Sequence, residues 1–578
     1  MRWLVAFLLV VPGASAHPML VAVVPDLPGT GPGDEGFAVG SNDGGDLSGW
    51  SVTDGKGLFA FPAGSVVGSG EMVWVVANRT AWSAFDGPPA QFVWTDSRLQ
   101  LANGGDALRL VDLRGTVVDS VAWGPGSGLN VSSPGLVFER DRLAGQWIDT
   151  GSDGDWVTPR VHRIGESTID PPTFTVHTLT LYASPDSSFS VLTHLVQSAE
   201  RRLHLHVYEL RSAALVDALV AAKQAHPALD LQVLVEAAPV GMTAPERHAT
   251  ADALRRIQGA GGTVVLAGRG RYDDHHLKVL VADDAVSVQS ENWVESGVPE
   301  DPTWGNRGWG VVLHDTAAAD WFATWMAQDR SSWDVDAFDL HSYDALFVAP
   351  PRVAPRSGGY GPVMPPVELR GDFGVQPLVS PDHTADPRTD PVAALMRGAR
   401  QEIDLEELEL ATGSANRLGW HADDALVSAL SEAAQRGVHV RVLAAAPFAS
   451  DPGNEPALAA LRVPGAEARI FDRRGIAILH NKGLIVDDAV VVGSMNGNHH
   501  SRAANREVDV ILRGPGVADA YRVLFETDWQ GKVPGPDASV IGRDVGAIPS
   551  ASWPMLLAAT ALAARQWSSR RGPGPPSP

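Results

Sequence analysis

The sequence predicts a multidomain protein in which a small β-sandwich precedes an α/β region made of two copies of one unit. Three observations support this: glycine-punctuated short strands near the start, one polar pattern that occurs twice, and matching strands and helices around both copies. With 578 residues, 44% of them hydrophobic, the chain can form several cores. It has no cysteine, which excludes disulfides, thiol nucleophiles and cysteine-ligated zinc.

Residues 1–16 are typical of a secretory signal peptide. Arg2 supplies a positive start, residues 3–11 are apolar, and Ala14-Ser15-Ala16 matches the small-residue pattern of a cleavage site. A buried amino-terminal helix is the alternative. We expect cleavage before His17 and export of the chain across the cytoplasmic membrane.

Residues 17–150 carry few helix signals and many short strands between glycines, which predicts a β-sandwich. The strings DLSGW at 46–50, LANGGDALRLVD at 101–112 and VVDSVAWG at 117–124 resemble the lamin-tail domain. This resemblance implies an immunoglobulin-like fold for the sandwich.

One pattern of five polar residues occurs twice, about two hundred residues apart, with offsets of 2, 7, 14 and 16 from a histidine. The chain has only five lysines, and two of them lie in the pattern, which indicates that a compact positive charge is needed there. The two copies are His276, Lys278, Asp283, Ser290 and Asn292, and His480, Lys482, Asp487, Ser494 and Asn496.

The apolar residues around each copy predict a hairpin of two short strands. If the first hairpin is symmetric about Asp284, Lys278 lies opposite Ser290. If the second is symmetric about Asp488, Lys482 lies opposite Ser494. Because residues i and i+2 and their cross-strand partners share one face, each hairpin is expected to present a polar cluster.

The duplicated HxK-x4-D pattern, followed by a G/S-x-N element, resembles the phospholipase D superfamily over roughly residues 172–535. The surrounding segments also recur: 202–210 matches 402–410, and helical patterns occur at 212–225 and 422–436. We therefore expect a duplicated α/β, pseudo-twofold, bilobal catalytic region. Its parts are a first repeat at 172–335, a Pro/Gly-rich linker at 350–366 and a second repeat at 367–535.

The resemblance implies a covalent phosphohistidine mechanism. One neutral imidazole attacks phosphorus while the other, protonated, supplies a proton to the leaving oxygen; the resemblance favours His276 as the nucleophile and His480 as the acid. The lysines would hold the phosphoryl oxygens, and the serines and asparagines would add hydrogen bonds. Asp283 and Asp487 would orient imidazoles or support the fold. No metal and no other cofactor is required.

The two copies differ in the residues next to the pattern. The second has Gly493 and, in Asn505-Arg506-Glu507, a carboxylate that the resemblance places on a catalytic histidine. The first has Gln289 and Gly308 at those positions. We expect this asymmetry to separate the pKa values of the two histidines.

Arginines precede both histidines and are candidates for binding an anionic substrate, with ordinary loop arginines as the alternative. The histidines outside the pattern are expected at the rim of the site or on the surface. These residues are Arg269, Arg271, Arg473, Arg474, and His275, His499 and His500.

Residues 545–564 are uncharged and are followed by the arginine- and proline-containing tail 565–578, which predicts a possible transmembrane anchor. A frayed or surface-docked helix is the alternative. Together with the signal peptide, this predicts an extracellular protein held at the membrane by its C-terminal segment.

The net charge of −23 argues against a general nucleic-acid coat protein. We predict a phosphodiesterase or phosphatidyltransferase that acts on phospholipids, including exchange of the cardiolipin-synthase kind. An extracellular nuclease and a surface scaffold with a degenerate catalytic core are the alternatives. The sequence leaves the oligomeric state open.

Overall fold

The computed structural model describes most of the chain between residues 17 and 531, with gaps. The described ranges are 17–27, 35–85, 87–127, 129, 135, 137–143, 146–151, 155–156, 167, 169, 171–385, 389–411, 425–446, 453–472 and 475–531.

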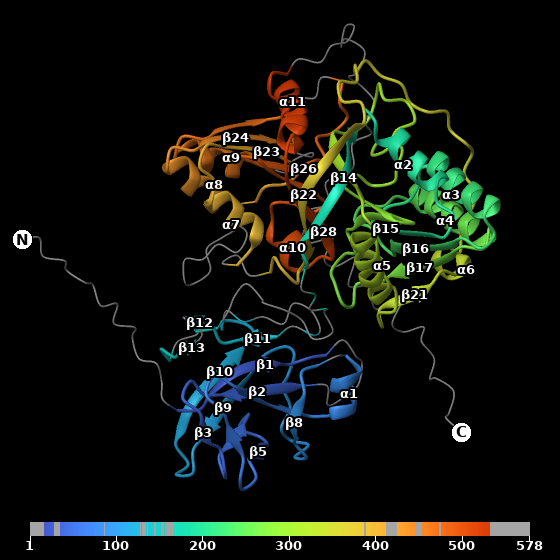
Figure 1. The fold of residues 1–578 in the computed structure, drawn as a ribbon. Coiled ribbons are helices and arrows are strands. Elements are labelled where there is room, and N and C mark those ends of the chain that lie inside the picture. Colours follow the sequence, from blue (N-terminus) through green and yellow to red (C-terminus); the bar gives the residue numbers. More distant parts are fainter. Residues whose placement is uncertain are drawn as a thin grey trace, which may run out of the picture.

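The N-terminal domain, blue in Figure 1, is formed by two antiparallel-rich sheets that share one core. Phe37 from one sheet and Val52 and Leu108 from the other are fully buried in that core. The first sheet has, in spatial order, β11 (Phe138–Glu139), β1 (Met19–Val24), β2 (Gly36–Gly40), β7 (Met72–Val76) and β8 (Ala90–Val93). The second has β10 (Val117–Trp123), β9 (Asp106–Val111), β4 (Ser51–Thr53) and β5 (Leu58–Ala60).

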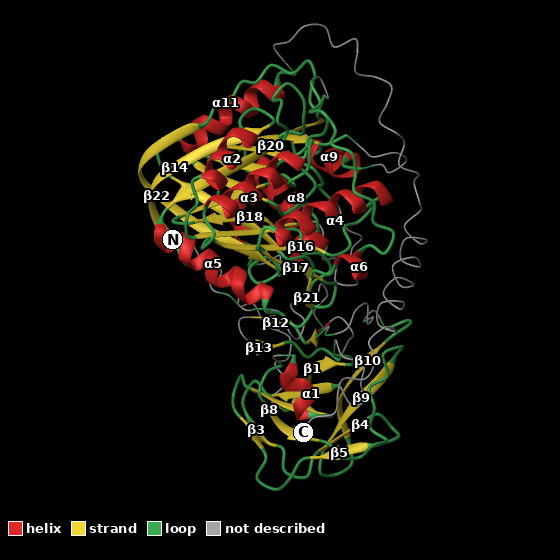
Figure 2. Cartoon of the chain, turned by 90° about the vertical axis from the view of Figure 1, so that its right-hand side faces the viewer, coloured by secondary structure: helices red, strands yellow, loops and turns green. Residues whose placement is uncertain are grey.

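Two short ribbons and one helix complete this domain: β3 (Gly45–Asp46) with β6 (Val66–Val67), β12 (Arg142–Leu143) with β13 (Gln146–Trp147), and α1 (Arg79–Ala84). Phe85, at the end of α1, packs edge-on against Trp333 of the C-terminal region, with ring centroids 5.1 Å apart. Figure 2 shows the N-terminal domain below the large sheet of that region.

The rest of the described chain is organised by one 15-stranded sheet. Its first half runs β21 (Val335–Ala337), β17 (Thr263–Ala267), β16 (Asp230–Glu236), β15 (Arg202–Val207), β18 (Lys278–Ala282), β19 (Ala285–Gln289), β20 (Gly308–His314) and β14 (Phe174–Ser184). It continues through β22 (Val367–Ser380), β28 (Glu507–Arg513), β27 (Ala489–Gly493), β26 (Lys482–Val486), β23 (Glu402–Glu407), β24 (His439–Ala444) and β25 (Glu467–Ile470).

The long strands β14 and β22 pair antiparallel at the centre of this sheet (Figure 1). Outward from them, both sides have the same order of pairing directions, four antiparallel pairs followed by two parallel pairs. The first side ends with one further antiparallel strand, β21. The parallel pairs are joined by helices, as parallel strands require.

Helices cover both faces of the sheet. One core, common to both halves, contains α5 (Thr316–Arg330) and α11 (Val517–Trp529). The opposite face is covered in the first half by α2 (Ser188–Gln197), α3 (Ala213–Ala225) and α4 (Ala244–Gly259), and in the second by α7 (Pro391–Arg397), α8 (Ala425–Gln435) and α9 (Glu455–Arg462). The short helix α6 (Leu340–Tyr343) packs against the core of the first half, and the short helix α10 (His499–Ala503) lies between β27 and β28 in sequence.

Burial on both faces explains why the central strands are continuous apolar runs. In β18, Val279 and Val281 belong to the common core, whereas Leu280 belongs to the core of the first half. Alternate residues of one strand therefore fix the sheet between two helical layers. This rigid setting is where both copies of the polar pattern lie.

The predicted localisation, an extracellular protein anchored by a transmembrane segment, is wrong on the structure. Among the described residues, no helix is long and apolar enough to cross a membrane. The longest, α4, has 16 residues and contains Glu246, Arg247 and further charges, whereas a bilayer requires about twenty apolar residues. The predicted anchor at 545–564, the tail 565–578 and the predicted signal peptide at 1–16 lie outside the described residues.

Candidate active site

Both copies of the pattern lie on matched hairpins, β18–β19 and β26–β27. Ala282 pairs with Ala285, so the turn consists of residues 283–284 alone, and Lys278 does not lie opposite Ser290. The predicted register is wrong by one residue, because a two-residue turn puts the reflection axis between the two aspartates. Asp283 has a φ of 48° there, and the second hairpin has the same register and turn.

The aspartates of the pattern are bound by backbone amides at the turn end of each hairpin. The Asp283 carboxylate accepts from the amides of Glu200, Arg201 and Arg202 at 2.9, 2.9 and 3.0 Å. Asp487 accepts in the same way from the amides of residues 400–402, at 2.9 to 3.1 Å. Of the two predicted roles, these contacts correspond to support of the fold.

The backbone of each histidine is bound by the other half of the sheet. His276 N donates to the carbonyl oxygen of Arg506, and His480 N donates to that of Arg307, each at 2.9 Å. Each of these bonds joins residues separated by more than 170 positions in sequence. Both His–Lys pairs are thus brought to the junction of the two halves.

A buried carboxylate from the opposite half faces Nδ1 of each imidazole. Nδ1 of His276 lies 2.7 Å from Oε2 of Glu507, the residue expected from the sequence. Nδ1 of His480 lies 3.4 Å from Oε2 of Glu291, which the sequence reasoning did not single out, and 3.5 Å from Nζ of Lys482. An Nδ1–H directed at a carboxylate leaves Nε2 as the nitrogen available to a substrate.

The two lysines are buried beside the histidines. Lys278 Nζ donates to the carbonyl oxygen of His276 at 2.8 Å, and Lys482 Nζ donates to that of His480 at 2.7 Å. Lys278 Nζ also lies 5.3 Å from the ring centre of Tyr208, whose edge packs against His276. Burial lowers the pKa of both lysines, although Glu507 next to Lys278 opposes the shift.

Burial and the lysine charges lower the pKa of both histidines, and that of His276 lies well below its ordinary value. At His480 the nearby Glu291 opposes this shift. Both imidazoles therefore favour the neutral form before an anion binds. The asymmetry in environment is the kind that assigns different roles to paired groups.

The serines and asparagines of the pattern close the site. Ser290 Oγ and Ser494 Oγ donate to strand carbonyls at 3.4 and 3.3 Å. Asn292 Nδ2 donates to Glu209 at 3.1 Å. The Oδ1 atoms of Asn292 and Asn496 are buried and have no hydrogen-bond partner among the described residues.

Two fully buried arginines lock the halves together, and the sequence reasoning missed them. The signal available was the repeated Asn-Arg dipeptide before β20 and β28, but its partners lie far away in sequence. Each arginine binds one aspartate from its own half and one from the other half. The pairs are Arg307 with Asp186 (2.7 Å) and Asp528 (2.6 Å), and Arg506 with Asp382 (2.9 Å) and Asp329 (2.9 Å).

Comparisons with known proteins agree with this architecture. Residues 393–529 match the family model described as cardiolipin synthase, PLD-like domain, and residues 40–125 match the lamin tail domain. The chain contains a phospholipase D-like domain and a lamin tail domain. The first copy of the pattern lies before the matched phospholipase D-like range. A search of the curated proteins found no match.

Among solved structures, the phospholipase D-like region is similar to several proteins at low identity. Phosphatidylserine synthase of Haemophilus influenzae Rd KW20 is 13% identical over 63% of this chain and 88% of that chain, with a TM-score of 0.45. The phospholipase D family member Nuc of Salmonella typhimurium is 16% identical over 29% and 99%, with a TM-score of 0.24. Polyphosphate kinase of Porphyromonas gingivalis is 12% identical over 61% and 47%, with a TM-score of 0.38. These likenesses are too distant to transfer an activity.

Two of the four arginines expected to bind substrate lie among the described residues, and both have a carboxylate nearby. Arg269 lies 2.7 Å from Asp274, and the buried Arg271 lies 4.0 Å from Asp329. Arg473 and Arg474 lie outside the described residues. The described part of the site thus has no basic track formed by these arginines.

The histidines outside the pattern divide in position. His275 is fully buried, so the expectation of a rim position is wrong for it, because the segment before β18 passes through the core. His500 has a half-exposed side chain 3.6 Å from Asp273 and 3.5 Å from Asp274. These carboxylates raise its pKa, and burial opposes the shift.

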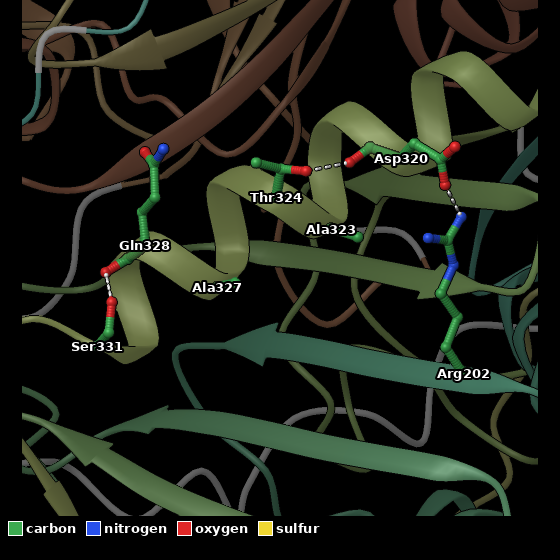
Figure 3. A pocket seen from close by; sticks show the side chains of 7 residues that line it. All are labelled: Arg202, Asp320, Ala323, Thr324, Ala327, Gln328 and Ser331. Carbon is green, nitrogen blue, oxygen red and sulfur yellow. Dashed lines mark hydrogen bonds and ion pairs between the residues drawn. The ribbon is translucent and has the colours of Figure 1, made fainter.

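A hollow of about 710 Å³ lies along the outer side of α5 (Figure 3). It is lined by Arg202 and by residues of α5 such as Asp320, Thr324 and Gln328. Arg202 and Asp320 form an ion pair of 2.7 Å at one end. None of its lining residues belongs to the repeated pattern. We therefore assign the candidate active site to the two His–Lys pairs and not to this hollow.

Proposed function

We propose that this protein is a phosphodiesterase or phosphatidyltransferase that acts on phospholipids through a covalent phosphohistidine. The observation that carries the proposal is the crossed support of the two histidines. Each imidazole has its backbone N–H on a carbonyl of the opposite half and its Nδ1 facing a carboxylate of that half. Two histidines held in this way form one site from both repeats, as a pseudo-twofold bilobal enzyme requires.

In the first step, Nε2 of His276 attacks phosphorus and the bond to the leaving alcohol oxygen breaks. His480, protonated at Nε2, gives its proton to that oxygen. The negative charge of the bound phosphodiester offsets the lysine charges that lower the pKa of His480, so substrate binding itself favours the protonated acid. Neutral His276 is ready to attack because its own pKa is lowered well below the ordinary value.

In the second step, His480 takes a proton from water or from a second alcohol, and the resulting oxygen nucleophile attacks phosphorus. The P–N bond breaks and His276 returns to its neutral form. Water gives hydrolysis, and an alcohol gives transfer. Lys278 and Lys482 would hold the non-bridging oxygens throughout, which supplies fixed positive charge without a metal ion.

A phospholipid is favoured over a nucleic acid by the charges around the site. Binding a polynucleotide requires several free cations along its backbone. In the described residues, Arg269 is bound to Asp274, and the same Asp274 adds negative charge near His276. A substrate with a single phosphodiester needs only the two lysines, and the match to a cardiolipin synthase-type domain supports the same class.

The test uses the full chain in EDTA with phosphatidylglycerol in detergent micelles, with and without added ethanol as a second acceptor alcohol. We expect release of phosphatidic acid or formation of an exchange product, and loss of both in His276→Ala and His480→Ala. Turnover that persists in either variant would refute the two-histidine mechanism. Cleavage of single-stranded DNA without any action on lipid would instead assign a nuclease.

A further inference from the structure

The two repeats carry their buried carboxylates at different positions. In the second repeat Glu507 follows the Asn-Arg dipeptide, whereas the first repeat has Gly308 there. Conversely, Glu291 follows Ser290 in the first repeat, where the second has Met495 after Ser494. Each repeat therefore keeps one glutamate near its hairpin, but in a different strand segment.

The side chain of Glu291 occupies the space that a side chain at position 308 would need. A Cβ added to Gly308 would lie 2.3 Å from Glu291 Oε1 and 2.4 Å from Ser290 Oγ. In the second repeat the corresponding position, 507, carries the glutamate itself. One carboxyl group is thus present at this place in each repeat, and glycine at 308 is what makes room for the one from Glu291.

The asparagine of the Asn-Arg dipeptide in each repeat supports the carboxylate of that repeat. Asn306 Nδ2 donates to Glu291 Oε2 at 3.2 Å, and Asn505 Nδ2 donates to Glu507 Oε1 at 3.1 Å. Glu507 also accepts from Ser501, whereas Glu291 Oε1 has no hydrogen-bond partner among the described residues. Glu291 thus has fewer hydrogen bonds than Glu507. Its Oε2 also lies farther from an imidazole Nδ1, at 3.4 Å from His480, than Oε2 of Glu507 does, at 2.7 Å from His276.

We propose that Glu291 is the positioning residue for His480. Its carboxylate takes the place that the carboxylate of a glutamate at position 308 would take. The glutamate can therefore be moved from 291 to 308 only when both positions are substituted together. This rests on the proposed function for its catalytic meaning. Glu291 holds Nδ1 of His480 and so keeps Nε2 directed at the leaving oxygen. It acts through the imidazole and does not itself touch the substrate.

The first test is an exchange experiment in the lipid assay with Glu291→Ala, Gly308→Glu and the double variant. We expect each single variant to lose about tenfold or more in kcat with little change in KM, because one lacks the carboxylate and the other crowds two side chains into one space. The double variant should regain activity to within about threefold of the original. A folded double variant no more active than Glu291→Ala would overturn the exchange.

Glu295→Gln is the matched control, because Glu295 is an exposed glutamate of the same loop. It should be indistinguishable from the original protein, whereas Glu291→Gln should show the kcat loss and an alkaline limb of the pH–rate profile shifted to lower pH. That direction follows because removal of the anion disfavours protonated His480. A Glu291→Gln variant with unchanged kcat and profile would overturn the assignment.

A second measurement needs no substrate. The rate at which diethyl pyrocarbonate acylates His480, followed by peptide mass spectrometry against pH, reports the fraction of neutral imidazole. Glu291→Gln should lower the midpoint by about half a pH unit or more, and Glu295→Gln should leave it in place. An unchanged midpoint in Glu291→Gln refutes the pairing. Absence of activity on every phosphodiester would refute the proposed function alone.

Discussion

Replacement of Asp283 by alanine separates a catalytic from a structural role for the aspartate of the pattern. Its carboxylate accepts from the amides of Glu200, Arg201 and Arg202. The first two amides are exposed and can bind water instead, so we assign most of the loss to the third bond and to the charge. Alanine at a φ of 48° costs about a further 1 kcal/mol. The expected loss in free energy of unfolding is about 3 kcal/mol.

The activity of the folded Asp283→Ala variant should stay within about twofold of the original. Asp283 lies five residue steps along the chain from Lys278, which corresponds to roughly 16 Å of strand. The measurement is the urea midpoint by tryptophan fluorescence, together with kcat in the lipid assay. Asp284→Ala is the control, since Asp284 is half-exposed and contacts the exposed side chain of Arg201. Its midpoint should hardly change.

The pH dependence adds a second check on the same variant. Partial burial opposes the shift, but the three amides lower the pKa of Asp283. A carboxyl whose folded-state pKa is lowered stabilises the protein above its unfolded value of about 3.9 and loses that contribution as the pH falls. The stability difference should therefore shrink below about pH 4. A variant with an unchanged midpoint and a hundredfold loss of kcat would show that Asp283 is catalytic.

Two further predictions concern the arginine that locks the repeats and the protonation of the nucleophile. Asp329→Asn removes one charged partner of the buried Arg506 and should lower the free energy of unfolding, measured by urea titration, by about 3 kcal/mol. The control is Glu368→Gln, in an exposed ion pair, which should cost less than about 0.5 kcal/mol. Equal losses in the two variants would contradict the locking role of Arg506. Because the pKa of His276 is lowered by burial and by the lysines, kcat/KM should fall on the acid side only below about pH 6.5, and an acid limb centred above pH 7 would contradict that environment.

Much of the architecture could be predicted because it leaves a local signal. The recurring apolar runs around 202–210 and 402–410 predicted strands that the structure has as β15 and β23. The offsets within the polar pattern predicted a hairpin in each repeat. The register was off by one because the pattern is compatible with more than one reflection axis, and only the turn conformation at Asp283 decides between them.

The partners of the histidines could not be predicted from one sequence in the same way. Glu291 stands in a segment that looked like a degraded copy of Gly493-Ser494-Met495-Asn496, and its replacement of a carboxylate at 308 becomes visible only when both residues are seen in one space. The buried Arg307 likewise depends on aspartates at distant positions. Contacts across the junction leave no periodic signal, whereas strands and helices do.

The crossed support of the histidines has a consequence for how the two repeats can change over time. The carboxylate that faces Nδ1 of His276 belongs to Glu507, 231 positions away, and the one that faces Nδ1 of His480 belongs to Glu291. A single substitution near one hairpin therefore alters the acid–base behaviour of the other. Under the proposed mechanism, the two halves can therefore give one histidine the role of nucleophile and the other the role of acid without any change in the two His–Lys hairpins. The carboxylate that faces each imidazole comes from the other half.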